Sequence, residues 1–502
     1  MGACSSPHRS DDSRQGRRIS RRTFAARAAA FGLSASAIGL LTSACSPGAP
    51  AAPPPAPPAS GSAPKPAEAA KPAAPPPPPA SGAAGQPAAA QQSAPAAKGD
   101  RIVSMWWEGK LPYEEKLRES QATTFEANNP GIKIKRTLQA DLTKVVIPAF
   151  STGSAPDVTQ TEGDFAMRKS LMDGKYVLPL DKYYDERKWP IFDWARTWSK
   201  IGGTTWEVPW EAQTHGIYYN KTALAKHGID IPKTYEDLTA AAEKGKKAGL
   251  VPFASDNDKA TNIRRSIMIH LYAVATPQQV REILLGDAKF DSPEMLEAVE
   301  RATAVFSNGW SDGKLGNTLV TDAATPDFAA GRNLFWLTGT FNAKRHKAQL
   351  KDFPDFDWGY MDVPPITKSL QWTTVGGIGS SFAINAKAAD VEAALKVIEF
   401  STGMDEQYNK TTLETLGFIP CMPFKYDGVP LREDDKYFIE SLSQNRDIGI
   451  QTNKLWPGDM VKYEEQAGQG LAAGEVTPKD FVATLAKMWE ENKKKPGERW
   501  IA

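Results

Sequence analysis

Alternating strand-like and helix-like stretches begin near residue 101 of the 502-residue chain. Residues 101–107 (Arg-Ile-Val-Ser-Met-Trp-Trp) predict a buried first strand, and residues 113–128 have the charge pattern of a helix. Residues 132–135 alternate apolar and polar side chains, which predicts a second strand, and residues 142–151 predict a second helix. Because this alternation continues along the chain, we expect βαβ units and largely parallel sheets flanked by helices, which is an α/β fold.

Later stretches extend this pattern. Thr234 followed by Asp237 has the spacing of an N-terminal capping pair, so a helix is predicted to start there. Residues 382–385 (Phe-Ala-Ile-Asn) predict a strand, and residues 389–402 predict an Ala-rich helix. The sequence contains no internal repeat, so the strands and helices are not copies of one smaller unit.

The segment before residue 100 does not fit this pattern. In residues 46–99, 37 of the 54 positions are Pro or Ala, and no aromatic or β-branched residue occurs. Such a segment buries too little apolar surface to offset the entropy lost on ordering. We therefore expect residues 45–99 to form a disordered tether, which in extended polyproline form reaches at most roughly 170 Å.

Residues 1–44 have the features of an export signal. Arg21 and Arg22 form a twin-arginine pattern, with a Ser before the pair and a Phe two residues after it. The 17-residue apolar run 28–44 follows, and it is shorter and less apolar than a membrane span, which needs about 20 residues. The run ends at Cys45 in a pattern that resembles a bacterial lipoprotein cleavage site, although Leu41 lies four rather than three residues before the cysteine. We predict that the exported protein is held at the outer face of the cytoplasmic membrane by lipid on Cys45 alone.

Two alternatives stay open for this segment. Ordinary signal-peptidase cleavage nearby would leave no lipid on Cys45. Residues 1–6 (Met-Gly-Ala-Cys-Ser-Ser) also fit an N-myristoylation pattern with a palmitoylatable Cys4. The second alternative leaves the arginine pair and the apolar run unexplained.

Net charge and cysteine content exclude several classes of function. The first 99 residues carry a charge of +7, so the chain total of +1 leaves −6 for residues 100–502. A weakly acidic domain argues against nucleic acid, which is bound by a clustered basic face. Cys421 is the only cysteine after Cys45, which excludes a disulfide framework, and the five scattered histidines lack zinc-site spacing. We expect no metal and no cofactor.

A series of short motifs occurs across residues 100–502. They are Phe125-Glu126 with Pro130-Gly131-Ile132-Lys133, residues 153–158 (Gly-Ser-Ala-Pro-Asp-Val), 178–181 (Leu-Pro-Leu-Asp), 218–221 (Tyr-Tyr-Asn-Lys), 232–238 (Pro-Lys-Thr-Tyr-Glu-Asp-Leu), Gly331-Arg332 and Gly376-Gly377. In order and spacing, these motifs resemble the extracellular solute-binding proteins of ABC importers, the large family that includes maltose-binding and other sugar-binding proteins. No single motif carries the resemblance.

The resemblance implies a two-lobed periplasmic-binding-protein fold of the Venus-flytrap kind, in which each lobe is a mainly parallel sheet flanked by helices. Two or three strands would cross between the lobes, which would close on a ligand. We expect residues 100–212 and 362–412 in the first lobe, and residues 213–361 and 413–502 in the second. The function implied is that a monomeric, non-enzymatic protein captures a solute and delivers it to ABC permease subunits.

Candidate binding residues lie directly after predicted strands, because ligands of open α/β sheets bind beyond the carboxyl ends of the strands. The resemblance places ligand contacts at the same four places. They are Trp106, Trp107 and Glu108; Glu162 and Asp164; Trp210 and Glu211; and Thr338 and Phe341. Weaker candidates are Asp256, Asn257, Trp372, Gly376, Gly377 and Trp456. For each residue the alternative is structural: a core aromatic ring, a solvated loop acid or a turn glycine.

The chemistry of these candidates favours a sugar or oligosaccharide. All 14 tryptophans lie in residues 100–502, although we expect more than half of them in the core. Flat aromatic rings suit the C–H faces of pyranose rings, and Asp, Glu and Asn form strong hydrogen bonds with hydroxyl groups. A polyamine, iron or a glycerophosphodiester remains an alternative ligand, since acidic candidates would suit a cation.

A carbohydrate-active enzyme is the alternative from another class. Glu207 and Glu211 resemble a pair of glycosidase carboxylates, but on an extended segment residues four apart lie about 13 Å from each other, too far for a retaining pair. The sequence contains no nucleophile elbow, P-loop or dinucleotide fingerprint. We expect Glu211 at the crossover between lobes, wet in the open form and binding ligand. The alternative is that it pairs with a lysine or arginine and only holds the hinge.

Replacing Cys45 by Ala tests the predicted anchor. We expect Cys45→Ala to release the protein into the medium or the soluble fraction, because no acylated residue would remain to hold it. Fractionation followed by immunoblotting measures the distribution, with Cys4→Ala as the matched control that stays on the membrane. Membrane retention of Cys45→Ala would show that the lipoprotein interpretation is wrong.

Overall fold

The structure is a computed structural model that describes residues 99–109, 112–139, 141–161, 165–254, 261–311, 321–367, 369–370, 373, 375–443 and 455–495. The predicted export signal with Arg21 and Arg22, the predicted lipidation site Cys45 and almost all of the predicted tether lie outside these residues. The folded region that the structure describes begins near residue 100.

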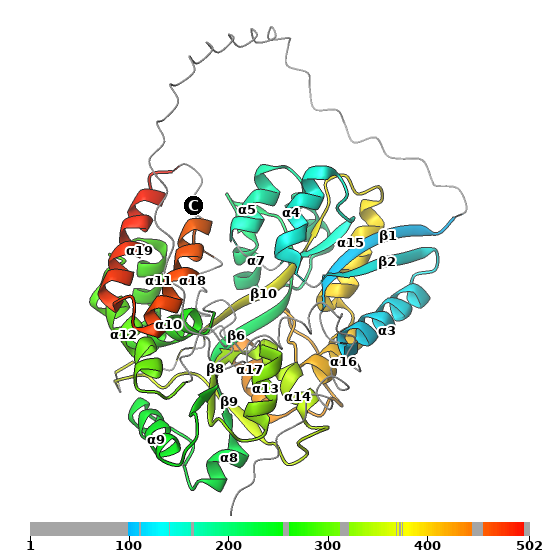
Figure 1. The fold of residues 1–502 in the computed structure, drawn as a ribbon. Coiled ribbons are helices and arrows are strands. Elements are labelled where there is room, and N and C mark those ends of the chain that lie inside the picture. The colour runs from blue at the N-terminus through cyan, green and yellow to red at the C-terminus, as the bar shows by residue number, and fades with distance from the viewer. Residues whose placement is uncertain are drawn as a thin grey trace, which may run out of the picture. The chain divides into compact units, whose positions relative to one another are not determined.

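A mixed sheet of eight strands runs through this region (Figure 1). The strand order is β2-β1-β3-β10-β6-β8-β7, and β9 also pairs with β6. The strands are β1 (Arg101–Glu108), β2 (Ile132–Gln139), β3 (Val158–Thr161), β6 (Val208–Asn220), β7 (Phe253–Ala254), β8 (Phe335–Gly339), β9 (Trp358–Met361) and β10 (Val375–Ile384). A separate small hairpin pairs β4 (Lys200–Ile201) with β5 (Thr204–Thr205).

The sheet consists of two groups of parallel strands joined by two long strands. The first strand group is β1, β2 and β3, which are parallel to one another. The second strand group is β7, β8 and β9, in which β7 is parallel to β8, and both β8 and β9 are antiparallel to β6. The connecting strands β6 and β10 are antiparallel to each other, because the chain leaves the first group through β6 and returns to it through β10. The prediction of mainly parallel sheets therefore holds within each group and fails at the connection.

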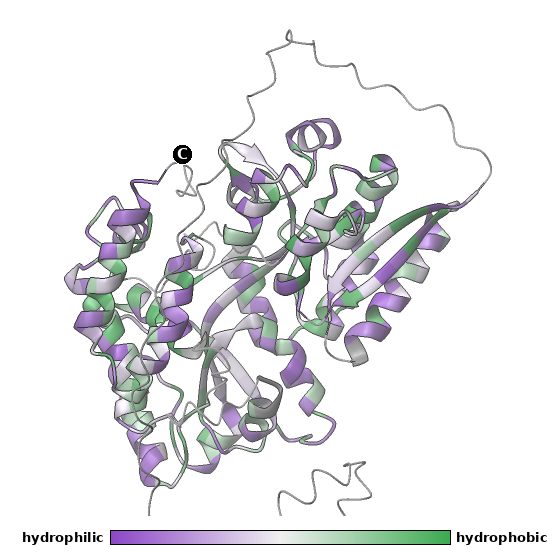
Figure 2. Ribbon diagram, turned by 45° about the horizontal axis from the view of Figure 1, so that its top comes forward, coloured by the Kyte–Doolittle hydropathy of each residue, from purple (hydrophilic) through white to green (hydrophobic). Residues whose placement is uncertain are grey.

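Helices cover the sheet and follow the strands in sequence, as the alternating pattern predicted. They are α3 (Pro112–Asn128), α4 (Leu142–Thr152), α5 (Phe165–Asp173), α6 (Asp181–Arg187), α7 (Asp193–Trp198), α8 (Lys221–Lys226), α9 (Tyr235–Lys247), α10 (Thr261–Val274), α11 (Pro277–Leu285), α12 (Pro293–Ser307), α13 (Thr321–Ala329), α14 (Ala343–Gln349), α15 (Val391–Glu399), α16 (Glu406–Leu416), α17 (Glu433–Ser443), α18 (Gly458–Ala473) and α19 (Pro478–Asn492). Figure 2 shows hydrophilic and hydrophobic residues alternating along many of them, as expected for helices with one buried face.

The predicted helices at 113–128 and 142–151 are confirmed as α3 and α4. The capping pair is also confirmed: the Thr234 hydroxyl accepts from the Asp237 backbone N–H, and the Asp237 side chain accepts from the Thr234 N–H. The predicted helix at 389–402 is shorter, since α15 ends at Glu399 and a π-turn over Phe400–Met404 follows. The predicted strand at 382–385 is the end of the longer strand β10, so Gly376 and Gly377 lie in a strand and not in a turn.

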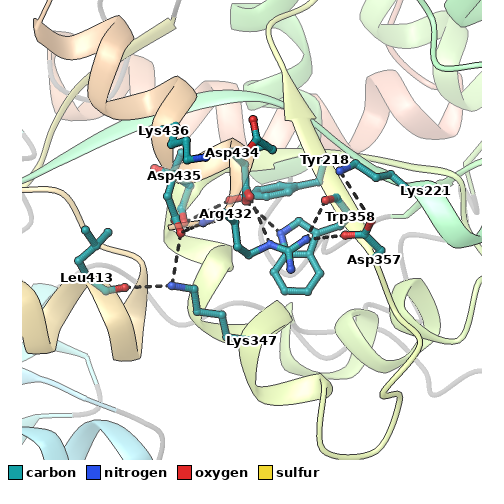
Figure 3. A network of polar contacts seen from close by, with 12 residues as sticks. Tyr218, Lys221, Lys347, Asp357, Trp358, Leu413, Arg432, Asp434, Asp435 and Lys436 are labelled. Atoms are coloured by element: carbon teal, nitrogen blue, oxygen red, sulfur yellow. Dashed lines mark hydrogen bonds and ion pairs between the residues drawn. The ribbon is translucent and has the colours of Figure 1, made fainter. Parts of the chain in front are cut away.

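A polar network fixes the start of α17 to β9 (Figure 3). The Arg432 guanidinium lies 3.7 Å from the ring centroid of Trp358 and donates to Asp357 at 2.6 Å. Asp434 accepts hydrogen bonds from the Trp358 indole at 3.0 Å and from Arg432 Nε at 3.3 Å. These contacts attach the chain beyond α16 to the second strand group.

His346 of α14 is fully buried in an aromatic cage. Five rings lie with their centroids 4.5–5.9 Å from the imidazole: Tyr218, Phe328, Trp336, Phe356 and Trp358. Neither ring nitrogen has a hydrogen-bond partner among the described residues. Burial, together with the nearby charges of Arg345 and Arg432, lowers the pKa of His346 to about 3, so the cage holds a neutral imidazole.

Stability should therefore fall as the pH drops below about 6.5. There the unfolded His346 binds a proton that the folded form does not, which costs up to about 1.4 kcal/mol of unfolding free energy per pH unit. We expect His346→Leu to flatten this dependence between pH 6.5 and 4, measured by urea unfolding. Burial also lowers the pKa of His270, to about 4. His270 therefore adds a similar loss of stability at low pH to the wild type and to His346→Leu alike. His227→Leu at a half-exposed position is the control, and an unchanged slope in His346→Leu would contradict the prediction.

Candidate ligand-binding site

The structure describes ten of the fifteen predicted ligand-binding residues. Glu162, Asp164, Asp256, Asn257 and Trp372 lie outside the described residues. The strand predicted before Glu162 is present as β3, which ends at Thr161. The others lie on or next to β1, β6, β8 and β10, except Trp456, which precedes α18. In the sheet, β10 and β6 are neighbours and β8 pairs with β6, whereas β3 separates β1 from β10.

The last three residues of β1 are Trp106, Trp107 and Glu108. The prediction placed them directly after the strand, so it is wrong by about three positions. Side chains alternate between the two faces of a strand, and the burial pattern shows this here. Trp107 is 1% exposed, whereas Trp106 and Glu108 are partly exposed at the carboxyl end of the strand. Trp106 and Glu108 therefore keep the positions that a binding role requires.

Trp107, Trp210 and Trp456 are core residues in this structure, with exposed fractions of 1%, 3% and 1%. The ring of Phe382 lies between the first two, with its centroid 6.3 Å from Trp107 and 6.0 Å from Trp210. Trp456 packs on Phe290 at 5.3 Å. Surrounding protein covers these three rings and leaves no face for a sugar in this conformation. They therefore fit the alternative interpretation, in which each is an aromatic ring of the core.

Glu211 lies near the start of β6, opposite Ser380 of β10. The register of the two connecting strands shifts on both sides of Ser380, which indicates β-bulges at this point. The carboxylate accepts hydrogen bonds from Gln213 Nε2 at 2.8 Å and from Ser380 Oγ at 3.4 Å. Its exposed fraction is 3%, so the expectation of a wet side chain is wrong in this conformation.

Burial raises the pKa of Glu211 to about 7, while the Gln213 hydrogen bond and the charges of Lys344 and Arg118 oppose this rise. Arg118 of α3 stacks on both core rings, with its guanidinium carbon 5.6 Å from the Trp107 centroid and 5.0 Å from that of Trp210. Two cations from helices far apart in sequence thus act on one buried carboxyl group. Neither cation forms an ion pair with Glu211 among the described contacts, so the hinge alternative, in which Glu211 pairs with a lysine or arginine, stays a prediction.

Glu207 is held in a buried ion pair at the start of β6. Its carboxylate lies 2.9 Å from Arg168 Nε, with side-chain exposures of 3% and 5%, and also accepts from the Thr161 hydroxyl at 2.7 Å. Glu207 thus ties the end of β3 to the segment that enters β6. Because Glu207 and Glu211 are both buried and hydrogen-bonded, they do not form an accessible pair of carboxylates.

Thr338 and Phe341 lie at the carboxyl end of β8. Thr338 is inside the strand and fully buried, where its hydroxyl accepts from Asn342 Nδ2 at 2.8 Å, so it is a structural residue here. Phe341 follows the strand, as predicted, and remains partly exposed. The Arg265 guanidinium carbon lies 4.9 Å from its ring centroid, and the ring of His215 lies 6.1 Å away, edge to face.

Gly376 and Gly377 pair with Thr214 and Gln213 in the connecting strands. Gly377 has a φ of 153°, a backbone conformation that favours glycine. These glycines therefore shape β10 beside Gln213, which is itself partly exposed.

Sequence reasoning missed several residues of this region. Gln213 lies two residues from Glu211, and side chains two positions apart share one face of a strand. This spacing from a predicted site residue could have identified Gln213. Arg118, Lys344 and Arg265 lie on helices that only the folded chain brings together, and no local pattern signalled them. Among the described residues, no helix is long and apolar enough to cross a membrane, and no group of three His, Cys, Asp or Glu side chains is arranged to hold a metal ion.

Glu211→Gln should change how stability depends on pH. A folded pKa of about 7, against the ordinary 4.5, means that the folded state keeps a proton which the unfolded state releases between these values. Wild-type stability is therefore lost as the pH rises from 4.5 through 7, by up to about 1.4 kcal/mol per pH unit, and the neutral glutamine avoids this loss. In urea unfolding, the unfolding free energy of Glu211→Gln should rise relative to that of the wild type as the pH increases across this range. Glu115→Gln at an exposed position of α3 should not, and a pH-independent difference for Glu211→Gln would refute the prediction.

Known proteins resemble this chain over most of the folded region. An uncharacterized ABC transporter extracellular-binding protein of Pyrococcus horikoshii is 24% identical over 398 residues, which cover 76% of this chain and 80% of that protein. The multiple sugar-binding protein of Streptococcus mutans is 23% identical over 331 residues, which cover 62% of this chain and 74% of that protein.

Solved structures share the fold. A chitin oligosaccharide binding protein superposes with a TM-score of 0.66 at 20% identity, over 78% of this chain and 98% of the other. This likeness confirms the predicted periplasmic-binding-protein fold. Residues 111–408 also match the family described as bacterial extracellular solute-binding protein. With its two strand groups joined by β6 and β10, this chain belongs to the bacterial extracellular solute-binding proteins.

Proposed function

We propose that this protein captures a sugar or an oligosaccharide by closing two lobes on it and delivers it to the permease of an ABC importer. The family match over residues 111–408 is the observation that carries the proposal. The names of the Streptococcus mutans relative and of the superposed structure, which specify multiple sugars and a chitin oligosaccharide, support the sugar class.

The two strand groups provide the lobes in this proposal. The first lobe comprises residues 100–212 and 362–412, and the second comprises residues 213–361 and 413–502. The predicted boundary at 412/413 falls inside α16, so this helix belongs to neither lobe alone. Closure bends the connecting strands, and the register shifts beside Ser380 support bending there, because bulges interrupt the regular ladder.

The side chains that remain partly exposed near the connection have the mixture that sugars require. Trp106 and Phe341 provide aromatic rings from the two strand groups, and Glu108 and Gln213 provide oxygen and nitrogen atoms for hydroxyl groups. We propose these four as the ligand contacts among the described residues. Binding involves no catalytic step in this proposal, since Glu207 and Glu211 are engaged in internal contacts.

We also propose that the protein works as a monomer outside the cell, held to the membrane by lipid on Cys45. The support is the sequence alone: the twin arginines at Arg21 and Arg22, the apolar run and the Pro/Ala-rich tether. Such a tether lets the folded region move away from the membrane without losing contact with it.

A thermal-shift screen of the full chain tests the ligand class. We expect raffinose, chito-oligosaccharides or related sugars to raise the melting temperature, and a ligand at 100 times its Kd stabilises by about 2.7 kcal/mol. Phe341→Ala and Trp106→Ala should lose at least half of this stabilisation, because each removes a ring that a sugar would cover. Tyr426→Ala is the matched control, since Tyr426 is 39% exposed and is not a proposed contact.

The other outcomes of the screen assign other functions. Stabilisation by polyamines or glycerophosphodiesters but not by sugars would replace the proposed ligand class. Sugar products appearing on chromatography after incubation with oligosaccharides would make the protein an enzyme and overturn the proposal.

A further inference from the structure

Strand β6 is partly exposed at two positions, and one of them lies at the connection. Eleven of its thirteen residues are buried, and the exceptions are Gln213 and Tyr219. Tyr219 lies near the end of the strand, beside β9. Gln213 lies where β6 pairs with β10, opposite Gly377. Gln213 is therefore the side chain through which the connecting strand can contact a ligand between the two strand groups.

Gln213 also lies beside the contact between β6 and the end of β8. The backbone N–H of Thr214 donates to the hydroxyl of Thr340, the residue before Phe341, at 3.2 Å. His215 shares a strand face with Gln213, and its ring lies 6.1 Å from that of Phe341. These contacts bring the Gln213 side chain close to the partly exposed Phe341 ring, which is a proposed ligand contact.

Glu211 determines how the carboxamide of Gln213 is turned. Gln213 Nε2 donates to Glu211 Oε1 at 2.8 Å, and Ser380 Oγ donates to Glu211 Oε2 at 3.4 Å. Because Glu211 is 3% exposed, Gln213 Nε2 is directed into the protein. In the part of the chain that the structure describes, no donor is hydrogen-bonded to Gln213 Oε1. The carboxamide therefore keeps its acceptor atom for another molecule.

Gly379 provides the space in which the Gln213 side chain lies. A Cβ at position 379 would lie 2.4 Å from Cγ, Cδ and Nε2 of Gln213, which are its three nearest atoms. The φ of Gly379 is not positive, so space and not backbone conformation requires a glycine here. Gly379 lies between Ile378 and Ser380, where the register of β10 shifts. The bulge and its glycine thus accommodate the carboxamide.

We propose that Glu211 and Gly379 are positioning residues that present the side-chain oxygen of Gln213 to a ligand as a hydrogen-bond acceptor. The carboxylate holds Nε2 inward, the missing side chain at position 379 leaves room for the carboxamide, and Oε1 accepts from an O–H group of the ligand. Glu211 thus acts on the ligand through Gln213 without touching it.

This role rests on the proposed function and narrows its ligand class. The ligand is a neutral sugar that offers a hydroxyl donor to Gln213 Oε1. The oxygens of a phosphodiester can only accept, so such a group at this point would bring two acceptors together with no proton between them. The site therefore disfavours glycerophosphodiesters at this position.

The side-chain amide of Gln213 reports its orientation without any ligand. In the full chain labelled with ¹³C,¹⁵N-glutamine, its NMR signal is the one missing from Gln213→Ala. One amide proton should exchange slowly with water in the wild type, because it is bonded to Glu211 Oε1. Glu211→Leu removes the acceptor and Gly379→Ala displaces the side chain, so both should abolish this protection. An amide that is unprotected in the wild type, or still protected in Gly379→Ala, would overturn the proposal.

Gly359→Ala is the matched control for Gly379→Ala. A Cβ at Gly359 of β9 would lie 2.3 Å from Cζ and Oη of Tyr219, so this substitution displaces the other partly exposed side chain of β6 in the same way. It should leave both the Gln213 amide and sugar binding unchanged. Glu211→Gln, which keeps an oxygen acceptor and the shape of the side chain, should retain most of the protection. Should Glu211→Leu not fold, Gly379→Ala decides the orientation.

Calorimetric titration with raffinose and, separately, with chitotriose measures the effect on binding. Gln213→Ala, Glu211→Leu and Gly379→Ala should each raise the Kd by roughly tenfold, because each removes or misplaces the same acceptor. In the Gln213→Ala background the other two substitutions should cause no further rise, since all three act through one group. A further rise of the same size in that background would overturn the proposal, because Glu211 or Gly379 would then act on the ligand independently of Gln213.

The same labelled protein shows which atom of Gln213 the ligand takes. When a sugar binds, the ¹³Cδ signal should move downfield, as expected for a carbonyl group that accepts a hydrogen bond, and the amide proton should stay protected. Loss of that protection on binding would show that the ligand takes Nε2, which would overturn the proposal.

Spermidine is titrated in parallel, because its ammonium groups are also hydrogen-bond donors. A downfield shift with spermidine alone would replace the sugar in the proposed function and leave Gln213 Oε1 as the acceptor. If neither sugar binds, the proposed ligand class fails for these two sugars. The ligand-free amide measurements then still decide whether Glu211 and Gly379 position Gln213.

Discussion

The antiparallel pairing of β6 with β10 is the contact on which the rest of the structure depends. These two strands form the link in the sheet between the first and second groups of parallel strands. Everything that places a side chain near the connection follows from their register: Glu211 opposite Ser380, Gly377 opposite Gln213, and Val375 opposite His215. Both carboxyl oxygens of Glu211 accept a hydrogen bond from a side chain of this pair of strands, which offsets part of the cost of burying the group.

Charge is distributed unevenly around this connection. Glu207 is neutralised in the first group by Arg168, at the entrance to β6. Glu211, four residues later, has no hydrogen-bonded cation in the described contacts and depends on amide and hydroxyl donors together with more distant positive charges. A glutamate therefore fixes the strand by an ion pair at position 207, whereas at position 211 the pKa of the glutamate is set by burial and by nearby donors and charges. Removing one partner of a buried pair such as Arg168–Glu207 leaves an uncompensated charge, so this end of β6 tolerates little change.

Local patterns were enough to predict α3, α4, the start of α9, the first strands and the α/β class, because apolar periodicity and capping residues such as Thr234 act within a few positions. They also placed Phe341 after a strand, whereas Trp106 and Glu108, predicted to follow a strand, lie within its last residues. They failed for Trp107 and Trp210, since only the folded chain shows that Phe382 covers their rings. The interactions of Lys344 join helices separated by more than two hundred residues, and no local signal encodes such a contact.

The separation in sequence between β3 and β10 has a consequence for how the chain reaches its native state. The first strand group obtains its neighbour on this side only when Ser381–Ile384 pair with Val158–Thr161, more than two hundred residues later. Until then β3 presents an unpaired edge, and unpaired edges promote association between chains. Contacts of such long range also slow folding, because the entropy of closing the loop is lost before the contact forms. A nascent or truncated chain that ends before β10 therefore lacks a complete first group, and its period of greatest risk of aggregation lasts while the chain between β3 and β10 is made.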